Sequence, residues 1–129
     1  MYRLQAVIAG TGVLVSDQVV PLPQDLVLLP LSAVPGPRQL AEWSLRGPVA
    51  FVDAEFFGGT GSQRAQVWDQ GRSVLGPLVR EEDDPMPGVT PISQALRRLG
   101  VVKGEHHDEF DAVGLGRHRD TEDWVTSAE

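Results

Sequence analysis

Residues 49–75 read VAFVDAEFFGGTGSQRAQVWDQGRSVL, and this stretch decides the fold. In residues 49–57 the even-numbered positions are all apolar and alternate with a mixed odd-numbered set, which is the period of two that a β-strand requires. Residues 63–68 alternate in the same way, and glycine-containing turns separate them from the first strand and from a third run at 72–75. The sequence therefore predicts three consecutive antiparallel strands joined by turns.

Toward the N-terminus, the pattern predicts three more strands and a helix. The apolar run at 4–9, the glycine turn at 10–12 and the apolar run at 13–15 predict a hairpin. Residues 26–31 are apolar and lie between prolines, which favours a strand at the edge of the sheet or as its cap. Pro37 is typical of a first helical position, and a two-turn helix is expected from there to the Gly-Pro pair before the central stretch.

Toward the C-terminus, the chain contains the helix with the most complete set of signals. Residues 81–88 are acidic and proline-rich, which predicts a solvated loop. Thr90 is a good N-cap, Pro91 fits the first helical position, and Gly100 follows the last apolar position of the helical repeat. Beyond this helix, residues 110–115 are apolar enough to be expected as a last strand.

These elements indicate an α+β fold with five or six mostly antiparallel strands and two short helices on one face of the sheet. Apolar residues make up 41% of the 129 positions, which is sufficient for one core. We expect residues 1–118 to form a single domain and residues 119–129 to form an acidic, mobile tail.

The charge is concentrated at the C-terminal end. The chain has a net charge of −7, and residues 105–129 hold eight acidic residues against two arginines. Nucleic-acid binding is not expected, because a phosphate backbone requires clustered Lys and Arg. No run of 18 apolar residues and no leader peptide are recognisable, so a membrane location is not expected. The absence of cysteine favours a reducing compartment, the cytoplasm.

Asp53 and Glu55 are candidate catalytic residues. They lie two apart on one predicted strand, so both carboxylates project from the same face at about 7 Å, a separation that paired acids use in glycoside hydrolysis. The alternative is structural, because Arg64 on the next strand can form a cross-strand ion pair with one of them.

The glycine-rich turn is a candidate anion-binding loop. Gly58, Gly59, Gly61 and Ser62 offer unobstructed backbone amides, which can form an anion-binding concavity. A phosphate-binding P-loop would need a Gly-Lys-Ser/Thr sequence followed by a helix, and neither is present. A wide hairpin loop is the alternative.

All three histidines lie in one short window. His106, His107 and His118, together with Asp120, supply the nitrogen and carboxylate donors that zinc or nickel would use. Their spacing matches no fixed metal motif, however, so solvated histidines on a polar segment are the alternative. No cofactor is expected.

The acidic segment carries apolar residues that a purely solvating tail would lack. Asp120, Glu122, Asp123 and Trp124 are therefore candidate partner-binding residues. We expect the segment to dock on its own sheet up to residue 118, with Trp124 beyond it as an exposed anchor or as a lid over one sheet face.

Two classes of function fit the sequence. The first is a small acidic protein-binding module without catalysis, such as an immunity-type inhibitor or accessory factor, that uses the tail and the Asp53/Glu55 face against a basic protein. The second is a small enzyme or a metal- or ligand-binding protein, in which Asp53, Glu55 and Arg64 converge with His107 or His118. Convergence of these groups distinguishes the two classes.

Overall fold

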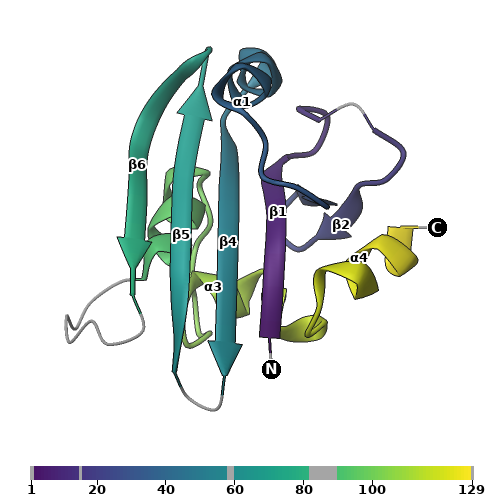
Figure 1. Cartoon of the computed structure of the whole chain (residues 1–129), viewed down its shortest axis with the longest axis vertical. Helices are drawn as coiled ribbons and strands as arrows, with labels where there is room; N and C mark the ends of the chain where they lie inside the picture. Colours follow the sequence, from purple (N-terminus) through teal and green to yellow (C-terminus); the bar gives the residue numbers. More distant parts are fainter. Residues whose placement is uncertain (1, 15, 58–59, 82–89, 129) are drawn as a thin grey trace.

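The computed structural model describes residues 2–14, 16–57, 60–81 and 90–128, which build one six-stranded antiparallel sheet (Figure 1). The strand order is β2-β3-β1-β4-β5-β6. The strands are β1 Tyr2–Gly10, β2 Val20–Leu22, β3 Leu26–Pro30, β4 Val49–Phe57, β5 Thr60–Asp69 and β6 Arg72–Arg80. The expected antiparallel sheet is confirmed, and β4, β5 and β6 form the expected meander.

Short helices complete an α+β fold. They are α1 Pro37–Trp43, α2 Pro91–Arg98, α3 Glu109–Ala112 and α4 Thr121–Ala128, with 3₁₀ turns η1 Ser44–Arg46 and η2 Leu115–Arg117. Within the described residues, no helix has the length and apolar character that crossing a membrane requires.

Helices cover both faces of the sheet, because successive side chains of a strand point to opposite faces. In β1, Ala6 and Ile8 enter one core cluster, which also contains the apolar residues of α2. Val7 and Ala9 enter a second cluster, which contains Leu40 of α1. The expectation that the two helices share one face is therefore not confirmed. We call the face under α2 the helical face and the opposite one the second face.

The helical face carries the larger core. Ile92, Ala95 and Leu96 of α2 are fully buried there and form an apolar stripe along one side of the helix. Helix α2 begins as expected: the Thr90 side chain accepts a hydrogen bond from the Ser93 N–H, and Pro91 is the first helical residue. Of the predicted loop at 81–88, residues 82–88 lie outside the described residues.

Three predicted elements differ from the structure. The expected N-terminal hairpin at 4–15 is wrong, because β1 pairs with β3 and β4 while residues 11–13 form a turn. Strand β3 is not an edge strand, since it lies between β2 and β1. The expected last strand at 110–115 is instead α3 and its following turn, because the Asp108 side chain caps the helix by accepting a hydrogen bond from the Asp111 N–H.

The C-terminal segment packs beside β1. Strand β3 ends opposite Ala6. Toward the N-terminal end of β1, residues near the C-terminus lie beside this strand instead of β3. The Arg3 N–H donates to the Arg119 carbonyl at 2.8 Å, and the Gln5 N–H donates to Thr121 Oγ1 at 3.1 Å. Helix α4 follows beside the N-terminal end of β1 (Figure 1), and its Trp124 is fully buried in the helical-face core.

Tyr2 makes a second link between the two ends of the chain. Its hydroxyl donates a hydrogen bond to the Leu115 carbonyl at 2.7 Å, and its ring packs against Phe56 and Phe110. Burial raises the pKa of the Tyr2 phenol well above its usual value, because the ionised form would lose its hydration.

Both edge strands of the sheet contain a proline. Pro21 lies in the middle of β2, and Pro77 interrupts β6 near an irregularity in the β5–β6 pairing. Arg72 and Arg80 stand at the two ends of β6.

Candidate functional site

The second face of the sheet is covered only in part. Helix α1 and the segment around Leu14 pack on the half that carries Val7, Val49 and Phe51. The other half carries Arg3, Asp53, Glu55, Arg64 and Gln66, which share this face by strand alternation. We call this half, with its borders, the open sheet face.

Three neighbouring hollows make up the open sheet face. A charged hollow of about 170 Å³ is lined by Arg3, Asp53, Glu55 and Arg64, among others. An apolar hollow of about 270 Å³ shares Arg64 and Val79 with it. An edge hollow of about 250 Å³ shares Arg3 with it and reaches α4. The three therefore form one continuous surface.

In the charged hollow, Glu55 is paired with an arginine from an unexpected strand. Arg3 Nη1 lies 3.1 Å from Glu55 Oε2, directly across from it in the β1–β4 pairing. The sequence had suggested Arg64, which lies opposite Asp53 but makes no ion pair within the described part of the chain. Both partners of the Arg3–Glu55 pair are about 40% exposed, so the pair contributes at most about 1 kcal/mol.

The apolar hollow combines exposed aliphatic groups with a buried donor. Val34 and Val79 are 60% and 48% exposed, and Phe51, Trp68 and Pro77 also line the hollow. The indole Nε1 of Trp68 is buried and has no hydrogen-bond partner among the described residues. An unpaired buried N–H costs about 1–3 kcal/mol.

The edge hollow brings the acidic C-terminal segment to the open sheet face. Asp120 and Glu122 line it together with Arg3 and the partly exposed Val125. Over the three hollows the carboxylates are Asp53, Glu55, Glu81, Asp120 and Glu122, and the cations are Arg3 and Arg64. Five negative charges against two positive charges leave this face with a formal charge of −3.

The expected exposed position of Trp124 is wrong. Its ring is completely buried, with the Arg117 guanidinium 4.7 Å from the ring centre and the His118 ring in edge contact at 4.6 Å. Trp124 lies in the core on the helical face of the sheet. Asp123 lies on the exposed surface of α4 but does not line the edge hollow. The expected mobility of residues 119–129 stays a prediction.

The histidines do not come together. His106 Nδ1 lies 3.1 Å from Asp111 Oδ2, His118 packs on Trp124, and His107 lines a separate cavity. No group of three His, Asp or Glu residues is placed to hold a metal ion in the part of the chain that the structure describes.

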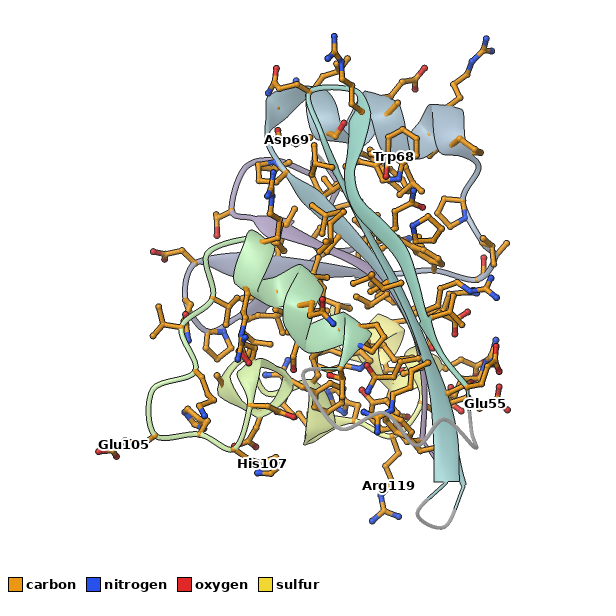
Figure 2. All side chains as sticks on the ribbon, turned by 90° about the vertical axis from the view of Figure 1, so that its left-hand side faces the viewer. Glu55, Trp68, Asp69, Glu105, His107 and Arg119 are labelled. Carbon is orange, nitrogen blue, oxygen red and sulfur yellow. The ribbon has the colours of Figure 1, made fainter. Side chains whose placement is uncertain are left out.

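The groups required by the enzyme hypothesis lie apart. Figure 2 shows Glu55 and His107 on opposite sides of the sheet. Neither His107 nor His118 lines the charged hollow that contains Asp53 and Glu55. The convergence of these carboxylates with a histidine is therefore not present in this structure.

The predicted anion loop is described only in part. Gly58 and Gly59 lie outside the described residues, whereas Gly61 and Ser62 belong to β5. Packing explains why residue 61 is a glycine, because a Cβ at this position would overlap the ring of Phe56, its neighbour across the strands.

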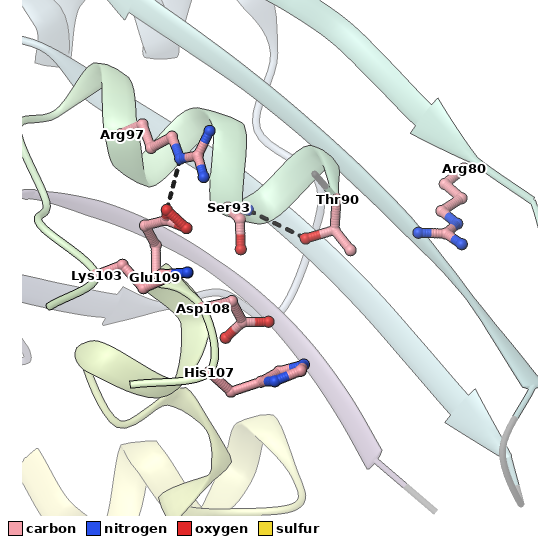
Figure 3. A pocket seen from close by; sticks show the side chains of 8 residues that line it. All are labelled: Arg80, Thr90, Ser93, Arg97, Lys103, His107, Asp108 and Glu109. Atoms are coloured by element: carbon pink, nitrogen blue, oxygen red, sulfur yellow. Dashed lines mark hydrogen bonds and ion pairs between the residues drawn. The ribbon is translucent and has the colours of Figure 1, made fainter. Parts of the chain in front are cut away.

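A larger cavity, which the sequence reasoning missed, lies on the helical face. We call it the helix-side cavity: about 400 Å³, lined by Arg80, Thr90, Ser93, Arg97, Lys103, His107, Asp108 and Glu109 (Figure 3). Glu109 is 2% exposed, and its Oε2 lies 2.6 Å from Arg97 Nε. One signal was available in the sequence, since Ser93 and Arg97 are four apart and therefore lie on one side of α2, beside its apolar stripe.

Comparisons with protein families, with curated proteins and with solved structures found no match to the chain. The function must therefore be inferred from the chemistry of the open sheet face and of the helix-side cavity.

Proposed function

We propose that this chain is a small acidic protein-binding module without catalysis, and that its open sheet face binds a basic protein. The continuity of the three hollows is the observation that supports this most. An immunity-type inhibitor or an accessory factor would work in this way, by covering or presenting a surface of its partner. The absence of cysteine favours the cytoplasm as its location.

The composition of the open sheet face resembles that of protein interfaces. Interfaces have an apolar centre, enriched in aromatic residues, and a polar rim. Here Phe51 and Trp68 line the apolar hollow, and Val34 and Val79 leave aliphatic surface exposed beside them. We therefore expect an apolar side chain of the partner to occupy this hollow, next to an acceptor for the Trp68 N–H.

The charge of the rim determines the kind of partner. The formal charge of −3 on the open sheet face agrees in sign with the −7 of the whole chain. A partner with Lys or Arg around an apolar anchor is complementary to this surface, whereas nucleic acid is repelled by it. Opposite charges speed diffusional encounter, and added salt screens them.

The test is capture from lysate followed by kinetics with the purified partner and three variants. Val79→Asp places a charge in the apolar hollow, and Glu122→Lys reverses a charge on the rim. Glu105→Lys is the matched control, because Glu105 is exposed and lines none of the three hollows.

We expect Val79→Asp to weaken binding by more than about tenfold, mainly through faster dissociation. Glu122→Lys should slow association about two- to fivefold at low salt, with the difference disappearing at high salt. Glu105→Lys should leave both rates unchanged. If all three variants bind the partner with the same association and dissociation rates, the open sheet face is not the interface.

A further inference from the structure

Ser93 places an unsatisfied hydroxyl in the helix-side cavity. The residue is 1% exposed, and its Oγ makes no hydrogen bond with any described residue. In Figure 3 its side chain points away from α2 into the space bounded by Glu109 and Asp108. Buried hydroxyls are normally hydrogen-bonded, so a group in the cavity that bonds Ser93 would complete this site.

Cationic side chains reach the same cavity from three separate segments. Arg80 comes from the end of β6, Arg97 from α2 and Lys103 from the segment after α2. Two carboxylates also line the cavity, so its formal charge is +1 with His107 neutral. This sign is opposite to that of the whole chain, whose net charge is −7.

Both carboxylates of the cavity already have partners. Glu109 Oε2 is 2.6 Å from Arg97 Nε, and Asp108 Oδ1 accepts the Asp111 N–H at 2.8 Å. Arg80 and Lys103 make no hydrogen bond or ion pair within the described part of the chain. Among the residues that the structure describes, two cations and one hydroxyl therefore remain for a ligand.

From this arrangement we infer that the helix-side cavity binds a small molecule that carries a phosphate group. A phosphate offers three terminal oxygens, and the donors of the cavity come from β6, α2 and the segment beyond α2, which suits a tetrahedral group better than a planar carboxylate. The volume of about 400 Å³ leaves room for the rest of a small metabolite.

This is a binding site and not a nucleophilic centre. Ser93, His107 and Asp108 are residue types found in hydrolase triads, but Ser93 Oγ has no hydrogen-bond partner in the described structure. Among the described residues, no base is therefore hydrogen-bonded to this hydroxyl.

The experiment is a titration of the ¹⁵N-labelled full chain, followed by NMR, with inorganic phosphate and with glucose 6-phosphate. Glucose and acetate serve as the neutral and carboxylate probes. Ser93→Ala and Arg80→Gln remove one donor each, and Arg98→Gln is the matched control, since Arg98 is exposed on α2 and does not line the cavity.

We expect saturable shifts of the Ser93 and Arg97 amides with either phosphate probe, and tighter binding of the ester than of inorganic phosphate. Ser93→Ala and Arg80→Gln should each weaken binding about tenfold, and Arg98→Gln less than about twofold. No saturable shift at about 10 mM phosphate would overturn the inference. Equal binding of acetate would also overturn it, as would equal losses in Arg98→Gln and Arg80→Gln.

Discussion

Replacing Trp124 with alanine tests whether the acidic C-terminal segment is part of the folded domain. The side chain is completely buried in the helical-face core, although its neighbours in α4 are mostly exposed. A mobile tail would contribute nothing measurable to stability. A docked helix that buries its tryptophan must contribute a large share, because the free energy of unfolding of a domain is only about 5–15 kcal/mol.

The size of the effect follows from the burial. A buried tryptophan removes about 150–250 Å² from water, which at about 25 cal/mol/Å² corresponds to about 4–6 kcal/mol. The indole Nε1 has no hydrogen-bond partner in the described structure, so Trp124→Ala also removes an unsatisfied donor that costs about 1 kcal/mol or more. We therefore expect Trp124→Ala to lower the free energy of unfolding by about 3–5 kcal/mol.

The measurement is urea denaturation followed by far-UV circular dichroism, because the mutation itself alters tryptophan fluorescence. Val125→Ala is the control, since the adjacent Val125 is 38% exposed and should lose less than about 1 kcal/mol. A loss below about 1 kcal/mol in Trp124→Ala, equal to that of the control, would refute the reasoning.

Four further predictions concern stability. Arg97→Met should lower the free energy of unfolding, measured in urea, by about 2–4 kcal/mol, because it leaves the buried carboxylate of Glu109 unpaired. Glu109→Gln should cost less, because it removes that charge. Equal losses in the two variants would contradict this explanation. Thr90→Ala should cost about 1 kcal/mol in thermal unfolding through loss of the helix cap, and an unchanged melting temperature would contradict the cap. Gly61→Ala should cost about 1–3 kcal/mol, measured in urea, because the new methyl overlaps a neighbouring ring. The free energy of unfolding should fall as the pH rises above about 10, because the phenol of Tyr2, the only tyrosine, ionises at a lower pH in the unfolded chain than in the folded one. Tyr2→Phe should remove this dependence of stability on pH. If the free energy of unfolding of the variant and of the unchanged protein falls in parallel with pH, the prediction is wrong.

The strands of the meander and helix α2 could be predicted because their signals are local. The alternation in residues 49–57 gives β4 with the bounds that the structure shows. Thr90, Pro91 and Gly100 likewise mark the ends of α2, and Gly100 has the positive φ of 99° that favours glycine. Each of these signals depends on the residue type at one or two positions, so no knowledge of distant contacts is needed.

The placement of α1 and the docking of α4 could not be predicted, because both depend on contacts distant in sequence. Leu40 and Trp43 indicate an apolar side of α1, but nothing in their spacing selects one face of the sheet. Trp124 lies in an acidic segment that resembles a tail, and its burial requires core residues more than 100 positions earlier in the chain.

The candidate sites were predicted unevenly for a related reason. Asp53 and Glu55 were recognisable as a pair because strand alternation puts them on one face. That Asp120 and Glu122 border the same face follows only from the hydrogen bonds between β1 and residues 119–121. The helix-side cavity was missed, because Arg80, Ser93 and Lys103 come from three segments that no motif connects.

The two edge prolines have a consequence for self-association. A proline has no N–H, so neither β2 nor β6 can offer an uninterrupted row of donors to a strand from another molecule. The arginines at both ends of β6 add like-charge repulsion between two such edges. Growth of the sheet by strand addition, a common route to aggregates, is therefore disfavoured at both edges.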